Sequence, residues 1–201
     1  MAPPTREALF VSLDASQAEQ ALDDVLAERG FERTDGSLPD PGVSVARSDT
    51  RFFDVAAVEP SLSVIREWSG YSDATPWRAA LELAEGLPVA ARMEMALPPA
   101  LSVLARALSR RTTVLGFAMR EQPLHLVGVA FRDGRATDVI TVVKDRIVVG
   151  TQGKPAAFSP HDARMRLTEW AAPHGVGPRA VELVLAESDL PATWRLVYLH
   201  S

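Results

Sequence analysis

Three apolar runs separated by short turns constrain the fold of this chain more than any other feature. The runs occupy residues 113–119, 124–131 and 136–143. Asp133-Gly134 lies between the last two, and this dipeptide is typical of a two-residue hairpin turn in which both residues have positive φ. The stretch therefore predicts an antiparallel meander, which residues 147–149 are expected to extend by a further strand.

The first thirty residues predict a strand followed by a helix. Residues 8–13 are apolar except for Ser12, so both faces are apolar enough for an interior strand. Ser16 and Glu19 form an S-x-x-E pattern, which predicts a capping box at the start of a helix. Helical spacing then continues to Gly30, where the helix is expected to end, and the residues on its buried face are Ala18, Ala21, Leu22, Val25 and Leu26.

The middle of the chain is predicted to mix loops, strands and helices. Two prolines and two glycines mark residues 35–42 as a loop. Strands are expected at residues 51–58, 62–68 and 89–97, and helices at residues 76–86 and 98–111. In the second helix the leucines are expected to be buried, while the side chains expected to face out are those of Ser102, Arg106 and Arg110.

The last third adds two helices, at residues 159–170 and 178–187, and a closing strand at residues 194–199. Together these elements predict the α+β class, with a mixed or largely antiparallel sheet of about seven to nine strands and four to five helices packed on it. Residues 1–201 are expected to form a single compact domain. Residues 1–5 are expected to be a frayed tail, and a seam, if there is one, is expected near residues 98–112.

Composition narrows the function classes. The 201 residues are 47% hydrophobic and contain no cysteine, which excludes disulfide scaffolds and thiolate chemistry. The chain has neither a secretory signal pattern nor a run of about 18 apolar residues, so we expect a cytoplasmic protein that does not interact with membranes. Residues 1–100 carry 8 basic and 17 acidic side chains, against 13 and 9 in residues 101–201. This asymmetry predicts either an acidic face for a basic partner or two halves that share one mixed surface.

Two glycine-containing stretches resemble phosphate-binding loops without meeting their requirements. Residues 150–155 place two glycines too close together, and Pro155 stands where a P-loop needs a hydroxyl residue. Residues 175–177 follow a predicted helix, whereas a dinucleotide fingerprint follows a strand. The chain also lacks a G-x-S-x-G nucleophile elbow and paired metal-binding histidines. We therefore expect no cofactor, no metal and no recognisable catalytic residue.

Single titratable residues remain candidates for chemistry. His125 shares a predicted strand face with Val127 and Val129, where it is either a hydrogen-bonded structural residue or a titrating group. Four carboxylates lie near predicted strand ends, where solvated turns are usual but paired acid and base groups are also conceivable: Glu67, Asp73, Glu121 and Asp133.

The strongest candidate for a binding surface is aromatic. Trp68, Tyr71 and Trp77 fall within ten residues, interleaved with Glu67 and Asp73. Trp and Tyr supply much of the energy at interface hot spots, although the same rings can instead pin a loop to the sheet. We predict a partner-binding patch formed by Trp68 and Tyr71, with Glu67 and Asp73 as its acidic rim.

The arginines suggest a second surface. Arg106, Arg110, Arg111, Arg120, Arg132 and Arg135 would form a basic strip over the meander. Because the chain is acidic overall, nucleic acid is not expected to be its partner. The leading hypothesis is a non-enzymatic binding protein that acts through a protein partner, one version being an inhibitor or immunity-type protein. The alternative is a small-molecule-binding protein or hydrolase-like enzyme with a pocket between sheet and helices, using scattered carboxylates, arginines and His125.

Overall fold

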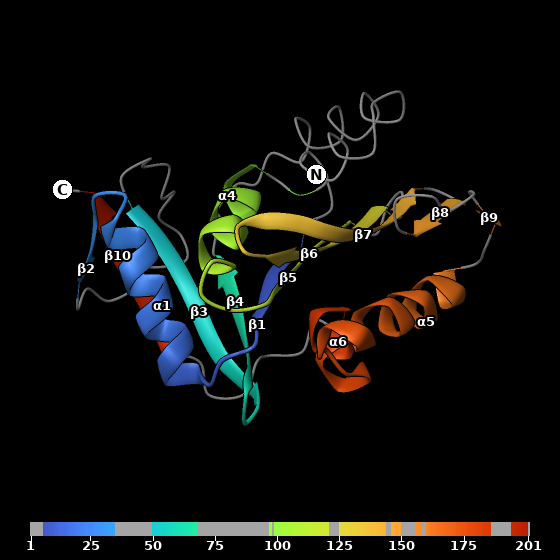
Figure 1. Ribbon diagram of the computed structural model, residues 1–201, viewed down its shortest axis with the longest axis horizontal. Helices are drawn as coiled ribbons and strands as arrows, with labels where there is room; N and C mark the ends of the chain where they lie inside the picture. Colours follow the sequence, from blue (N-terminus) through green and yellow to red (C-terminus); the bar gives the residue numbers. More distant parts are fainter. Residues whose placement is uncertain are drawn as a thin grey trace, which may run out of the picture.

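A computed structural model describes the greater part of the chain (Figure 1). The described residues are 6–34, 50–67, 97, 99–120, 125–143, 146–149, 156–157, 160–185 and 194–200. Within them lie four α-helices, α1 (Ala15–Ala27), α4 (Pro99–Leu108), α5 (Pro160–Ala171) and α6 (Pro178–Leu185), and one 3-10 helix, η1 (Ala172–His174). None of the helices in these residues is long and apolar enough to cross a membrane.

Ten strands form one sheet in the order β2-β10-β3-β4-β1-β5-β6-β7-β8-β9. All neighbouring strands are antiparallel, so the predicted α+β class with a largely antiparallel sheet is confirmed. In chain order the strands are β1 (Arg6–Val11), β2 (Phe31–Thr34), β3 (Thr50–Glu59), β4 (Leu62–Glu67), β5 (Val114–Arg120), β6 (His125–Arg132), β7 (Arg135–Val143), β8 (Arg146–Val149), β9 (Ala156–Ala157) and β10 (Trp194–His200).

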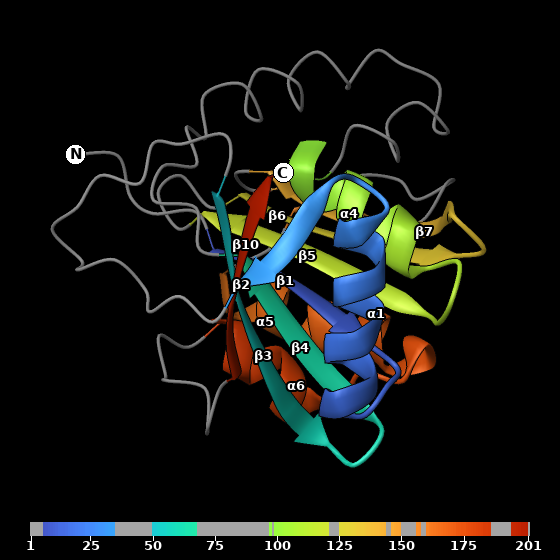
Figure 2. The same ribbon diagram turned by 90° about the vertical axis from the view of Figure 1, so that its left-hand side faces the viewer.

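Helices cover both faces of the sheet. Figure 2 shows α1 in front of β3 and β4, with α5 and α6 behind them. Leu9 and Val11 of β1 pack with α1 and α4 in one core cluster, whereas Ala8 and Phe10 pack in the other with residues of α5 and α6. Both faces of β1 are therefore buried, which confirms the prediction of an interior strand.

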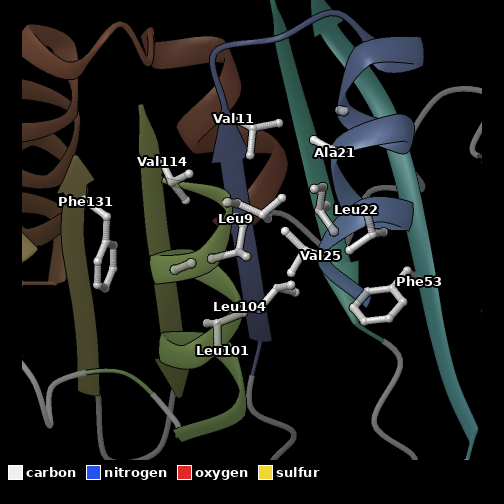
Figure 3. Close-up of a cluster of buried hydrophobic side chains, with 14 of the residues drawn as sticks. Leu9, Val11, Ala21, Leu22, Val25, Phe53, Leu101, Leu104, Val114 and Phe131 are labelled. Carbon is white, nitrogen blue, oxygen red and sulfur yellow. The ribbon is translucent and has the colours of Figure 1, made fainter. Parts of the chain in front are cut away.

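The core beneath α1 and α4 follows from the helical spacing of their apolar residues. Figure 3 shows Leu22 and Val25 of α1 and Leu104 of α4 beside Leu9 of β1. The five predicted core residues of α1 are all buried. In α4 the leucines are buried as predicted, but Ser102 is only 6% exposed, so its predicted outward position was wrong. Because α4 packs against α1 as well as the sheet, it buries a wider face than the leucine stripe alone.

The predicted capping box of α1 was also wrong. The helix begins at Ala15, and Asp14 is its N-cap. The Asp14 carboxylate accepts a hydrogen bond from the Gln17 backbone N–H at 2.8 Å, and the Gln17 side chain accepts one from the Asp14 N–H at 3.3 Å. Asp14 and Gln17 therefore form the capping box, with the backbone N–H groups of these two residues as the donors. The box lies two residues earlier than the predicted one at Ser16 and Glu19.

The meander forms as the sequence predicted. Strands β5, β6 and β7 pair in succession, and the hairpin between β6 and β7 turns at Asp133-Gly134. Asp133 and Gly134 have φ of 52° and 76°, as a two-residue hairpin turn requires. The predicted loop at residues 35–42 and the predicted helix at 76–86 lie outside the described residues. So does the predicted strand at 89–97, except for its last residue, Leu97, which is buried.

Candidate functional site

Glu67 is the only residue of the predicted partner-binding patch that lies in the described part of the chain. It is the last residue of β4. Trp68, Tyr71 and Asp73 lie outside the described residues, as do Trp77 and Glu121. The binding role of the patch therefore stays a prediction, and the surroundings of Glu67 are the starting point for a site.

Arg51 holds Glu67 in a two-pronged ion pair. The Nε and Nη2 atoms of Arg51 each donate a hydrogen bond of 2.7 Å to the two carboxylate oxygens of Glu67. The side chains are only 15% and 16% exposed, so the pair is largely shielded from water. The Arg51 guanidinium also lies 5.1 Å from the centroid of the Phe53 ring and 5.8 Å from that of Phe31. Bidentate pairing and aromatic contacts together fix this arginine.

Glu7 of β1 is a second carboxyl group beside Glu67. Strands β1 and β4 pair Leu9 with Ile65, and extending this register by two residues places Glu7 opposite Glu67. Side chains two residues apart on a strand share a face, so Glu7 lies on the same face as Leu9, under α1 and α4. Burial, together with the negative charge of Glu67, raises the pKa of Glu7 from its usual 4.5 to about 7.

The two carboxyl groups differ in their partners among the described residues. Arg51 is committed to Glu67 through both oxygens, and Glu7 relieves the repulsion by keeping its proton. Near neutral pH the site, which we call the glutamate site (Glu7, Glu67 and Arg51), can therefore donate or accept a proton. It can also balance one further positive charge, because a cation beside Glu7 would favour its ionised form.

A second polar cluster lies on the other face of the sheet, where α5 and η1 meet β7. One carboxylate oxygen of Asp138 accepts a hydrogen bond from Trp170 Nε1 at 3.0 Å and lies 3.3 Å from His174 Nε2. Its other oxygen accepts the Val139 backbone N–H at 2.8 Å. A carboxylate in this position can hold an imidazole ring in one orientation.

The sequence did not indicate either of these clusters. Asp138 is separated from His174 by 36 residues, and Glu7 from Glu67 by a helix and two strands, so no local motif marks them. The alternation of β1 places Glu7 on the same strand face as the apolar Leu9, and this acidic residue in line with core positions is the signal that could have found it.

Two further predicted candidates, His125 and Asp133, lie in the described part of the chain. His125 is the first residue of β6, where its backbone is paired with Arg120 and Val143. Asp133 lies in the exposed β6–β7 turn. Over the described ranges, no three His, Asp or Glu side chains gather in a way that could hold a metal ion.

The fold and the site define this chain as an α+β protein with an antiparallel sheet between two helical layers and a pair of glutamates at one end of its central strands. No family model matches the sequence. Neither a curated protein nor a solved structure matches it.

Proposed function

We propose that this chain is a non-enzymatic, cytoplasmic binding protein that acts through a protein partner, as an inhibitor or immunity-type protein would. The partner would dock at the end of the sheet that carries the glutamate site. The segment with Trp68, Tyr71 and Asp73 follows Glu67 directly in the sequence, so it begins where β4 ends. The aromatic rings would supply the buried contact area and the carboxylates the acidic rim.

The observation that supports this proposal is that Glu7 lies beside Glu67, whose two carboxylate oxygens are both bonded to Arg51. A lysine or arginine of the partner placed beside Glu7 would supply a second positive charge. Glu7 would then lose its proton on binding, because a nearby cation lowers the pKa of a carboxyl group. Binding of a basic partner would thus be coupled to the release of about one proton near neutral pH.

Affinity capture from the native host, followed by mass spectrometry, would identify the partner. Calorimetric titration in buffers of different ionisation enthalpy then counts the protons released on binding. We expect Trp68→Ala to weaken binding by about 2 kcal/mol and Glu7→Gln to abolish proton release. Glu169→Gln is the matched control, because Glu169 is 54% exposed on α5. Unchanged affinity and proton release in both test variants would refute the proposal.

The alternative is a small-molecule-binding protein or hydrolase-like enzyme with a pocket between sheet and helices. The contact of His174 with Asp138 favours this alternative, since such a pair can act as a general base. His174→Gln would then abolish turnover of a substrate while leaving the folded protein intact. Loss of partner binding in the same variant would instead show that the residue is structural.

We also propose that the chain acts as a single domain. Strand β1 pairs directly with β5, which joins the segments before and after residues 98–112 in one sheet. Limited proteolysis tests this proposal: two protected fragments that separate under native conditions would contradict it.

A further inference from the structure

The C-terminal end of α4 lies against the β6–β7 turn (Figure 1). The backbone N–H of Asp133 donates to the Ser109 carbonyl at 2.9 Å. The Gly134 N–H donates to Ser109 Oγ at 3.0 Å, and Ser109 Oγ donates to the Arg106 carbonyl at 3.0 Å. These bonds fix the turn against the helix.

Three arginines flank the Asp133-Gly134 turn, and we call them the arginine tip: Arg110, Arg132 and Arg135. All three are exposed. A Cβ on Gly134 would lie 3.4 Å from Cγ and Nε of Arg110, so the Arg110 side chain lies against the turn. Within the described ranges, none of the three forms an ion pair with a carboxylate. By contrast, the neighbouring Arg111 pairs with Asp24 of α1 and with Glu28, the C-cap residue of that helix.

These three positive charges do not stabilise the fold. Arg132 and Arg135 are direct cross-strand partners in the hairpin, and like charges directly opposite each other destabilise a strand pair. An arginine near a helix C-terminus can satisfy its carbonyl groups, but Ser109 Oγ and the Asp133 N–H already bond the Arg106 and Ser109 carbonyls. The arginine tip is therefore surplus to what this contact needs for stability.

We propose that the arginine tip is a docking surface for an acidic segment of a partner protein, a run of Asp and Glu side chains. Guanidinium groups bind carboxylates through two parallel hydrogen bonds. Nucleic acid fits less well, because nucleic-acid-binding domains are usually positively charged overall, whereas this chain carries a net charge of −5. The turn's exposed residues are arginines and Asp133, with no aromatic ring for a base to stack on.

This surface is distinct from the glutamate site. Val114 pairs with both Val11 and Phe131, so the turn that follows Phe131 lies toward the Val11 end of β1. Glu7 pairs with Ala118 toward the opposite end of that strand. The arginine tip would bind an acidic segment and the glutamate site a basic group, so the two proposals can fail independently.

The test is fluorescence anisotropy with a labelled peptide of alternating glutamate and glycine. The matching glutamine peptide and a single-stranded DNA oligonucleotide serve as the other probes. We expect R132Q/R135Q to weaken binding of the glutamate peptide about tenfold at low salt, as loss of two ion pairs implies. Its melting temperature should not fall. The control R166Q/R179Q removes the same charge from exposed arginines of α5 and α6, and it should change affinity less than about twofold.

Several outcomes would overturn the proposal. Equal weakening by both double variants would mean that only the net charge matters. Failure of the glutamate peptide to bind, or equal binding of the glutamine peptide, would remove the carboxylate requirement. Preferential binding of DNA that R132Q/R135Q abolishes would assign the tip to nucleic acid. A dimer in light scattering that dissociates in R132Q/R135Q would assign it to a second copy of the chain.

Discussion

Replacing Glu7 with glutamine should make the protein more stable above neutral pH and flatten its pH dependence. The pKa of Glu7 is about 7 in the folded protein and near the usual 4.5 in the unfolded chain. Between these values the folded protein holds a proton that the unfolded chain has lost. Stability from this group is therefore highest at acidic pH and falls as the pH rises through about 7.

The size of the effect follows from the two pKa values. A shift of this size corresponds to about 3 kcal/mol in full. Between about pH 5 and pH 8, where most of the proton is lost from the folded protein, the expected loss is about 2.5 kcal/mol. Glutamine keeps the shape and hydrogen-bonding capacity of a protonated glutamic acid but cannot ionise. The variant should escape this loss.

Urea unfolding at about pH 5 and pH 8 gives the change in the free energy of unfolding between the two pH values. The effect is the difference between this change in wild type and in Glu7→Gln. This comparison cancels the titration of every other group. Glu169→Gln, with Glu169 exposed on α5, should retain the wild-type pH dependence. If Glu7→Gln shows the same loss between the two pH values as wild type, the burial of Glu7 beside Glu67 does not raise its pKa and the reasoning fails. A carbon NMR titration of the Glu7 carboxyl group would then locate its true midpoint.

Three further substitutions test the packing that supports these sites. Tyr198→Phe should cost about 1–2 kcal/mol in urea unfolding, because it removes the 2.6 Å hydrogen bond from the buried hydroxyl to Asp23 of α1; an unchanged midpoint would contradict this. Gly128→Ala should lower the free energy of unfolding by about 1–3 kcal/mol, because the new Cβ would lie 2.5 Å from Trp170 Cζ3. An unchanged melting temperature would show that the helix carrying Trp170 shifts without cost. Asp138→Asn should lower the free energy of unfolding by about 1 kcal/mol. It should also alter the near-UV circular dichroism of Trp170, whose indole N–H donates a hydrogen bond to Asp138. Identical spectra and stability would show that this hydrogen bond does not contribute to stability.

Elements with a regular spacing of apolar residues could be predicted from the sequence. The strands of the meander and the buried face of α1 match the prediction because alternation and helical spacing are local properties of a few residues. The two-residue turn at Asp133-Gly134 was predictable for the same reason. The start of α1 could not be predicted in this way. Asp14-x-x-Gln17 and Ser16-x-x-Glu19 both match the capping-box pattern, and the sequence does not distinguish between them.

The order of the strands could not be predicted. Strand β10 lies between β2 and β3, although 160 residues separate it from the end of β2. What fixes it there is tertiary: Tyr198 bonds Asp23 and its ring meets Phe53 edge to face, with centroids 5.7 Å apart. Burial and the bond to Asp23 also raise the pKa of Tyr198 above its usual value, so this hydroxyl stays protonated as a donor.

The glutamate site and the arginine tip illustrate why clusters of charged side chains are harder to predict than strands. Each combines side chains whose local sequence is ordinary: a glutamate at a strand start, a glutamate at a strand end, arginines beside a turn. The strand register brings these side chains together. It places Glu7 beside Glu67, a carboxylate already paired with Arg51, and it places Arg132 opposite Arg135. Both arrangements set like charges against each other, which folding alone disfavours. A cost of this kind, repeated at both ends of the central strands, is what a protein would retain if partners of opposite charge bind there.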